Sequence, residues 1–176
     1  KCHKYDYGRN QEDEGAGQKM SITVAKSAGF CFGVNRAINI VNSLLDKNVK
    51  VSTLGPIIHN MEVVNELESR GCKAVDNIDE VEKDATLVIR SHGVPKYVID
   101  KLDENGVKYE DATCPFVKKI HNIVANPDNK DGIVLIAGNS VHPEVESIIG
   151  HCSTECHTFK NNEEIDEIYK KKKKKN

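Results

Sequence analysis

Two cysteines and two histidines stand in register in two segments of this sequence. Cys31 opens CFGVNRAINIV and Cys114 opens CPFVKKIHNIV, each with Val three residues later, a basic residue at five and Asn-Ile-Val at eight to ten. An imidazole follows each thiol after 28 residues, at His59 and His142. Thiolates are soft metal ligands, and imidazoles bind metals or donate hydrogen bonds to anions. Matched groups of these kinds predict a centre that both segments serve.

A constant offset relates the two segments. The members of each pair are 83 residues apart, and the same offset carries Gly55 onto Gly138. Each half then reads cysteine, helix, strand, glycine and histidine. Self-similarity of this kind is the signature of repeated structural units. We therefore expect related lobes that present their thiols and imidazoles to a common centre.

The segments that position these groups alternate between strand and helix patterns. Helices are expected over 34–45, 60–71, 95–106, 114–126, 142–150 and 161–172. Strands are expected over 21–27, 49–55, 72–76, 86–91, 107–112, 132–138 and 156–159. The apolar run over 132–138 indicates a buried strand. Alternating strands and helices predict an α/β fold, with lobes of mostly parallel sheet and flanking helices.

The repeat also predicts how the chain is divided. Residues 1–19 are expected to form a flexible leader, 20–106 a complete first lobe, 107–169 an incomplete second lobe, and 170–176 a disordered lysine-rich tail. The first lobe contains TLVIRSHGVP, and its counterpart would begin at Tyr169, where the sequence offers only lysines and a final asparagine. The second lobe is therefore expected to lack its last strand.

All five candidate residues follow a predicted strand and precede, or nearly begin, a predicted helix: Cys31, Cys114, His59, His92 and His142. Ligands of open parallel sheets bind beyond the carboxyl ends of the strands. Helix N-termini there favour anions and thiolates. Thiols far apart in sequence suit a cluster held between lobes better than a zinc knuckle. The histidines suit a phosphate-like anion, and the alternative is that each is an ordinary loop histidine.

Glycines flank Cys31, Pro115 follows Cys114, and one carboxylate follows the last histidine. Gly29 and Gly33 on either side of Cys31 would let a bulky ligand approach the backbone. Pro143 in HPEVE suits a first helical position, which puts Glu144 in the first turn. This carboxylate either stabilises the helix dipole or donates a proton beside a bound anion.

A competing metal site is present in HCSTECH, residues 151–157, which contains His151, Cys152, Cys156 and His157. Zinc accepts these donors, although a strand there would turn neighbouring side chains to opposite faces. Of the remaining cysteines, Cys72 is expected in the core and Cys2 lies in a polar segment.

Composition limits the class of protein. The chain has 176 residues and a net charge of −2, with 38% hydrophobic and 30% charged residues. This balance favours a soluble cytoplasmic protein and argues against a nucleic acid partner. No apolar run approaches the roughly 18 residues of a membrane helix, and no signal peptide is visible.

Five motifs in order, GFCFGVNRAI, GPIIHN, RSHGVP, DATCPFVKKIH and HPEVE, resemble the 4-hydroxy-3-methylbut-2-enyl diphosphate reductase family of the non-mevalonate isoprenoid pathway. The resemblance implies three α/β lobes around a [4Fe-4S] cluster held by three cysteines, with one iron free for the substrate's hydroxyl. It also implies reductive dehydroxylation of an allylic diphosphate to isopentenyl and dimethylallyl diphosphate, with ferredoxin or flavodoxin as electron donor. It assigns roles as cluster ligands (Cys31 and Cys114), substrate contacts (His59, His92 and His142) and proton donor (Glu144).

Parts of the family's pattern fall beyond residue 176. These are the third cluster cysteine, a threonine and a serine–asparagine stretch that grips the diphosphate. Cys152 and Cys156 come too early in the order of motifs to be the third ligand. The sequence thus predicts the first lobe and part of the second lobe of such a reductase. The alternatives are a non-catalytic zinc-binding module and an inactive truncated product.

Overall fold

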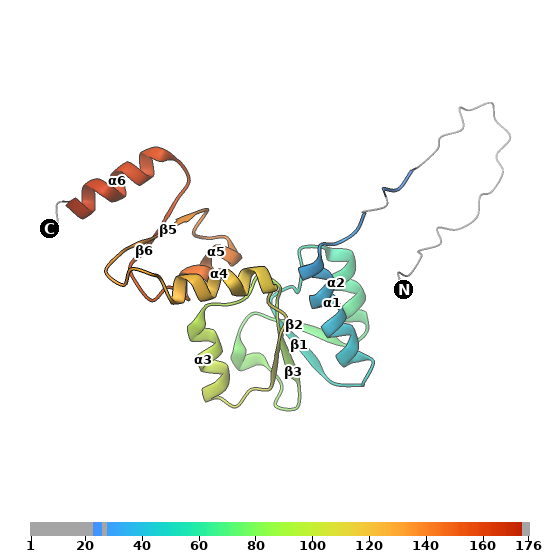
Figure 1. The fold of residues 1–176 in the computed structure, drawn as a ribbon. Coiled ribbons are helices and arrows are strands. Elements are labelled where there is room, and N and C mark those ends of the chain that lie inside the picture. Colours follow the sequence, from blue (N-terminus) through green and yellow to red (C-terminus); the bar gives the residue numbers. More distant parts are fainter. Residues whose placement is uncertain (1–22, 26–27, 174–176) are drawn as a thin grey trace, which may run out of the picture.

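The computed structural model describes residues 23–25 and 28–173, and it contains two parallel sheets (Figure 1). The larger sheet has the strand order β2 (Cys72–Val75), β1 (Val51–Leu54), β3 (Thr86–Ile89) and β4 (Tyr109–Asp111). Every neighbouring pair is parallel. The chain moves outward from β1 to β2, then returns to β3 on the opposite side of β1. The direction of winding therefore reverses between β1 and β3.

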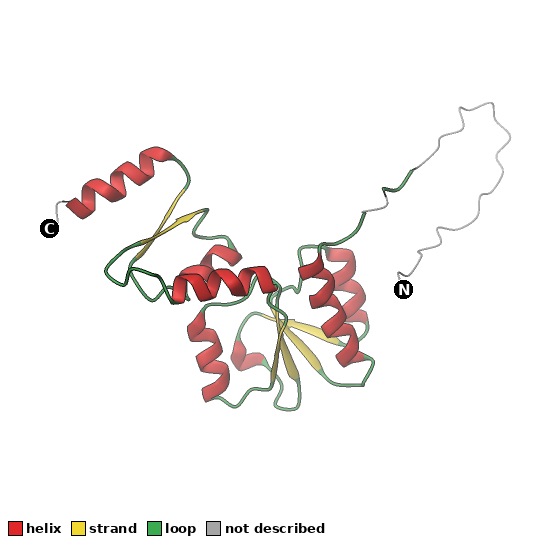
Figure 2. Ribbon diagram, in the orientation of Figure 1, coloured by secondary structure: helices red, strands yellow, loops and turns green. Residues whose placement is uncertain are grey.

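Helices cover both faces of the larger sheet (Figure 2). Helices α1 (Phe32–Leu45) and α2 (Met61–Ser69) pack on one face, where Val88 joins their core cluster. Helix α3 (Lys96–Glu104) and the short 3-10 helix η1 (Ile78–Glu80) pack on the other face with Leu87 and Ile89. Successive side chains of β3 thus point into opposite cores, as a strand requires. Both cores are apolar, which explains the continuous hydrophobic run of β3.

The second unit is built on a smaller sheet. It comprises α4 (Pro115–Ala125), β5 (Val134–Ala137), α5 (Pro143–Ile149), β6 (Cys156–Phe159) and α6 (Asn162–Lys173). Strands β5 and β6 pair in parallel. The expected order of cysteine, helix, strand, glycine and histidine is therefore present in both units. The α/β fold with parallel sheets and flanking helices is confirmed.

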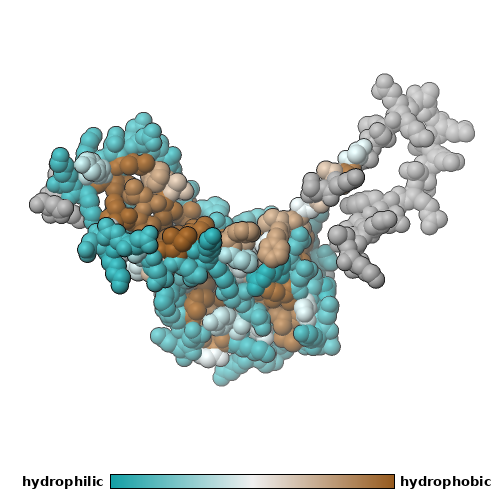
Figure 3. All heavy atoms as spheres, viewed as in Figure 1, coloured by the Kyte–Doolittle hydropathy of each residue, from teal (hydrophilic) through white to brown (hydrophobic). Residues whose placement is uncertain are grey.

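The expectation of a buried strand over 132–138 is wrong. Residues of β5 alternate between half-buried and exposed, and the Leu135 side chain is 43% exposed. A two-stranded sheet has too little area to bury both faces of a strand. Figure 3 accordingly shows a broad apolar surface over this lobe, whereas the apolar patches of the larger lobe lie among polar residues.

Three other expectations need correction. Residues 23–25 are irregular rather than a strand, and the Val24 side chain is 74% exposed, so no sheet face supports the alternating pattern there. The lobe boundary expected after residue 106 falls too early, because β4 pairs with β3 and completes the larger sheet.

The lysine tail expected from residue 170 is helical as far as Lys173, where α6 ends. Lysine is a good helix former, and four lysines in the last turn interact favourably with the helix dipole. The leader expected over 1–19, Cys2, and residues 174–176 lie outside the described residues. None of the helices in the described part of the chain is long and apolar enough to cross a membrane.

Candidate functional site

The three histidines predicted from the sequence gather at the carboxyl edge of the larger sheet. His59 lies after β1 and His92 after β3, and their ring centroids are 4.9 Å apart. His142 follows β5, and its ring centroid is 6.1 Å from that of His92. The loops after β1 and β3 diverge at the point where the winding reverses. Such a switch point is where open parallel sheets bind ligands, so the cluster occupies the expected position.

His92 is the most enclosed of the three rings. Its Nδ1 atom is buried and has no hydrogen-bond partner within the described residues. Burial lowers the pKa of the imidazole from 6.5 to about 4, with His59 and Arg90 as the next largest causes. The ring is therefore neutral at physiological pH. It can donate a hydrogen bond to an anion without adding a charge.

This environment predicts a specific pH dependence. Because the folded-state pKa of His92 is lowered, the unfolded chain binds more protons than the folded chain between pH 6.5 and about 4. The free energy of unfolding should therefore decrease as the pH falls through this window. A carbon-13 NMR titration of the histidine rings should give a His92 midpoint near 4 in the folded protein. A midpoint near 6.5, equal to that of the urea-denatured chain, would contradict this environment.

Arg90 is a site residue that the sequence reasoning missed. It directly follows β3, and its Nε atom is buried without a hydrogen-bond partner among the described residues. Its Nη1 atom lies 3.2 Å from where a Cβ would stand on Gly55, whose φ is +68°. The guanidinium thus reaches from the end of β3 to the end of β1, beside the histidines. The available signal was a basic residue placed directly after a buried strand, in the same loop as His92.

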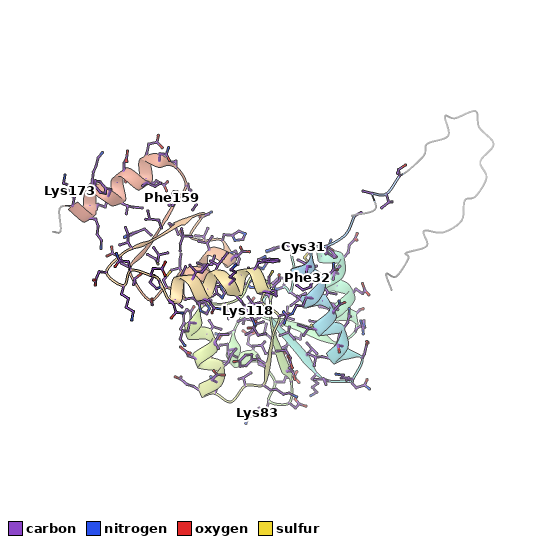
Figure 4. All side chains as sticks on the ribbon, in the orientation of Figure 1. Cys31, Phe32, Lys83, Lys118, Phe159 and Lys173 are labelled. Atoms are coloured by element: carbon purple, nitrogen blue, oxygen red, sulfur yellow. The ribbon has the colours of Figure 1, made fainter. Side chains whose placement is uncertain are left out.

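The two predicted thiols lie at neighbouring helix N-termini. Cys31 is the N-cap residue of α1 and is exposed, and Cys114 is the N-cap residue of α4 and is half-buried. Figure 4 shows Cys31 and Phe32 at the start of α1, beside the first turn of α4. Arg36 of α1 holds the two segments together by donating to the backbone oxygens of Asp111 and Thr113, both at 3.2 Å.

Gly33 is the point of closest approach between these helices. A Cβ at this position would lie 2.7 Å from Sγ of Cys114 and 3.0 Å from its Cβ. Of the two glycines expected to leave space for a bulky ligand, Gly33 faces the second thiol instead, whereas no atom lies within 4 Å of a Cβ built at Gly29. The missing side chain at residue 33 brings the Cys114 sulfur against the first turn of the helix that begins at Cys31.

Replacing Gly33 with alanine should destabilise the protein. Alanine alone would favour the helix by about 1 kcal/mol, but the overlap with Cys114 should cost about 1–3 kcal/mol. We expect a lower midpoint of urea denaturation and a faster reaction of the displaced Cys114 thiol with iodoacetamide. Asn39→Ala, at an exposed position of α1, is the matched control. Increased stability of Gly33→Ala with an unchanged Cys114 reaction rate would rule out the close contact.

His142 and Glu144 are fixed by the first turn of α5. His142 is the N-cap residue, and its Nδ1 accepts a hydrogen bond from the backbone N–H of Glu144 at 3.2 Å. Pro143 occupies the first helical position, as the sequence predicted. The cap fixes the orientation of the His142 ring, and it places the half-buried Glu144 directly after the histidine cluster.

The other described cysteines belong to different environments. Cys72 is 7% exposed, and burial, followed by the nearby Glu68, raises the pKa of its thiol to about 11. Its expected core position is confirmed. Cys152 lies close to Cys156, and burial is the main reason that the pKa of the Cys152 thiol is raised to about 12. A thiol that stays protonated is a poor metal ligand.

The histidines of HCSTECH also have separate partners. His151 bonds to the backbone oxygen of Val94 at 3.1 Å, and His157 pairs with Glu155 at 2.8 Å. Across residues 23–25 and 28–173, no three His, Cys, Asp or Glu side chains form a group that could hold a metal ion. The zinc alternative for this segment is therefore not supported. Cys31 and Cys114 fit two positions of a larger ligand set, because both are free thiols at helix N-termini.

Comparison with known proteins gives one consistent match. Among curated relatives, 4-hydroxy-3-methylbut-2-enyl diphosphate reductase from Clostridioides difficile is 39% identical over 150 residues, and that from Alkaliphilus oremlandii is 43% identical over 151. Each alignment covers 85% of this chain and 54% of the relative. The chain thus spans about half the length of the curated relatives it matches.

Solved structures agree with these relatives. A structure of (E)-4-hydroxy-3-methyl-but-2-enyl diphosphate reductase, the terminal enzyme of the non-mevalonate pathway, matches with a TM-score of 0.72 and 38% identity, covering 83% of this chain and 53% of that one. The reductase from Plasmodium falciparum matches with a TM-score of 0.71 and 29% identity, covering 80% and 45%. The family model described as LytB protein matches residues 22–175, and the chain therefore belongs to the LytB protein family.

Proposed function

We propose that this chain supplies the amino-terminal half of a 4-hydroxy-3-methylbut-2-enyl diphosphate reductase. The observation that carries the proposal is that three imidazoles and a guanidinium meet at the switch point of the larger sheet. Two thiols lie at the same junction between the lobes, where the Cys114 N–H bonds to Ser91. The first group suits an anionic substrate, and the second suits a metal cluster. The relatives from Clostridioides difficile and Alkaliphilus oremlandii carry this activity in their names.

The proposed reaction is a reductive dehydroxylation. The C–O bond to the substrate's hydroxyl breaks, two electrons and two protons are taken up, and water leaves. One proton goes to the departing oxygen and the other to carbon, which gives isopentenyl or dimethylallyl diphosphate. The electrons must come from an external carrier, for which a ferredoxin or a flavodoxin is the candidate.

The diphosphate is assigned to the imidazole cluster and Arg90. A neutral His92 donates a hydrogen bond to a phosphate oxygen, and His59 and His142 approach from the loops on either side. Arg90 supplies a permanent positive charge beside them, which the neutral His92 does not. Charge-assisted hydrogen bonds to phosphate are the strong kind, so Arg90 should dominate the affinity.

The cluster is assigned to Cys31 and Cys114 as two of its ligands. An iron–sulfur cluster bound there would supply electrons and a Lewis-acidic iron. The chain's own contribution is to bring two free thiols to the adjacent N-termini of α1 and α4. Free thiols of this kind persist in the reducing cytoplasm, which is the proposed location.

Glu144 is assigned as the proton donor. Its backbone is tied to His142, so a substrate held by the histidines would meet this carboxyl group at a fixed position. A protonated carboxyl can deliver the proton that turns the leaving hydroxyl into water. The same residue lies in the first turn of α5, directly after the proline at the first helical position.

Calorimetric titration of the 176-residue chain with inorganic pyrophosphate tests the anion site. Arg90→Gln should weaken binding about 10- to 100-fold, since a hydrogen bond to a charged group contributes about 1.5–3 kcal/mol. Arg70→Gln is the matched control, because Arg70 pairs with Asp46 at the C-terminal ends of α2 and α1. Equal affinity of the wild type and Arg90→Gln, or an equal loss in the control, would count against the assignment.

A further inference from the structure

A pair of buried polar side chains joins two helices of the second unit, next to the loop that carries His92. His121 of α4 and Ser147 of α5 are 7% and 0% exposed, and His121 Nε2 lies 3.0 Å from Ser147 Oγ. The His121 ring also stacks on that of His151, with centroids 4.0 Å apart and planes 14° from parallel. This polar contact lies inside the packing of α4 against α5.

The loop that carries His92 presses directly on this pair. Gly93 has a φ of +76°, and a Cβ there would lie 2.9 Å from Cε1 of His121, 2.9 Å from Oγ of Ser147 and 3.0 Å from Cγ2 of Thr113. Because no side chain intervenes, the backbone next to His92 packs against both α4 and α5 of the second unit. The His121–Ser147 pair therefore forms part of the surface on which this loop rests.

The same loop is held on its other side by the end of α5. The His151 ring bonds to the Val94 oxygen at 3.1 Å, and the Lys96 N–H donates to the Gly150 oxygen at 3.3 Å. The thiol segment is attached as well, since the Cys114 N–H donates to the Ser91 oxygen at 2.9 Å. Two segments with assigned roles thus attach to the loop that carries His92, namely the start of α4 and helix α5, and His121 contacts this loop at Gly93.

We propose that His121 is a positioning residue, which holds α4 and α5 against the loop after β3 and so fixes His92, His142 and Cys114 relative to one another. The proposal rests on the function proposed above, because those three residues are the ones assigned to substrate and cluster. His121 would not touch either group. It would act through the hydrogen bond to Ser147, the contact with Gly93 and the stack on His151.

The charge state of His121 supports this role. Burial lowers its pKa to about 4, with the adjacent His151 as the next cause. Two other charged groups face it: Asp111 raises the pKa and Lys118 lowers it. The ring is neutral at physiological pH, so it packs on His151 without charge repulsion and exchanges a hydrogen bond with Ser147 at no cost in buried charge.

The test compares His121→Leu, His121→Gln and Ser147→Ala in the 176-residue chain. Glutamine can place an amide nitrogen near the position of Nε2 and should restore the bond to Ser147, whereas leucine and the alanine at 147 remove it. Asn122→Ala, at an exposed position of α4, is the control. Ring-proton NOEs between His92 and His142 report the arrangement without ligand, and pyrophosphate titration reports its consequence. Both are measured where each variant is fully folded by circular dichroism.

We expect the His92–His142 NOE to be lost or strongly reduced in His121→Leu and Ser147→Ala, and retained in His121→Gln and the control. Pyrophosphate affinity should fall about tenfold in the first two variants, the equivalent of one lost charge-assisted hydrogen bond. Lower stability with unchanged NOEs and affinity in the folded variants would reduce His121 to a packing residue and overturn the proposal. If the wild type bound no pyrophosphate, the proposed anion site would be refuted, and the NOEs would still decide the role of His121. If His121→Leu did not fold, Ser147→Ala would decide it.

Discussion

Replacing Cys114 with serine should lower bound iron and sulfide by about tenfold or more in a chimera of this chain with the remaining half of the Clostridioides difficile relative. Removing a residue that only hydrogen-bonds to a metal ligand lowers metal affinity by about 10- to 100-fold, and removing a ligand itself should cost at least as much. Serine keeps the size and the N-cap position but removes the soft thiolate. Cys31→Ser should behave alike, because the two residues stand at equivalent places in the repeat. Iron and sulfide are measured after anaerobic reconstitution.

Cys152→Ser is the control for this experiment. Cys152 is also a half-buried thiol at the end of a helix, with its Sγ 3.5 Å from the Ile148 oxygen, but it lies outside the proposed site. Its replacement should leave the iron and sulfide content unchanged. Equal loading of the wild type, Cys31→Ser and Cys114→Ser would show that other residues hold the cluster.

Glu144→Gln should lower turnover of the same chimera by about 10²- to 10⁴-fold, the usual contribution of a positioned general acid. Glutamine preserves the size of the side chain, and the backbone N–H of residue 144 still donates to Nδ1 of His142. Affinity for pyrophosphate should therefore change little, so the loss should appear in kcat rather than in KM. Steady-state kinetics with a chemical reductant measure both.

Glu146→Gln provides the comparison for Glu144. Glu146 is in the first turn of the same helix, so it shares the interaction with the helix dipole, but its side chain is exposed. Near-normal turnover is expected for this variant. If the two substitutions reduced kcat equally, the effect would come from helix stability and not from proton transfer.

Much of the site followed from the sequence because its residues obey simple positional rules. His59 and His92 follow strands of one parallel sheet, whose carboxyl ends lie at one edge, so their approach was predictable from the α/β pattern. His142 follows β5 of the smaller sheet, and its position was suggested by the repeat. The repeat then related Cys31 to Cys114. The contact of Gly33 with the Cys114 sulfur was less accessible, because it depends on how two helices meet in space.

Other features depend on tertiary contacts that local patterns do not encode. The position of Arg90 directly after β3 was a weak signal, and its buried Nε and the approach of its Nη1 to Gly55 place it in the site. Strand β4 was separated from its sheet because the repeat marks a boundary in sequence, whereas pairing with β3 is decided by register. The irregular backbone around Val24 shows that an alternating pattern without a partner face does not make a strand.

The most direct measurement of the central claim is anaerobic turnover of 4-hydroxy-3-methylbut-2-enyl diphosphate by the reconstituted chimera. The proposed assignment predicts isopentenyl and dimethylallyl diphosphate as products, with strongly reduced turnover when Arg90 is replaced by glutamine. A chimera that is loaded with iron and sulfide to the level of the intact relative, yet forms neither product, would contradict it.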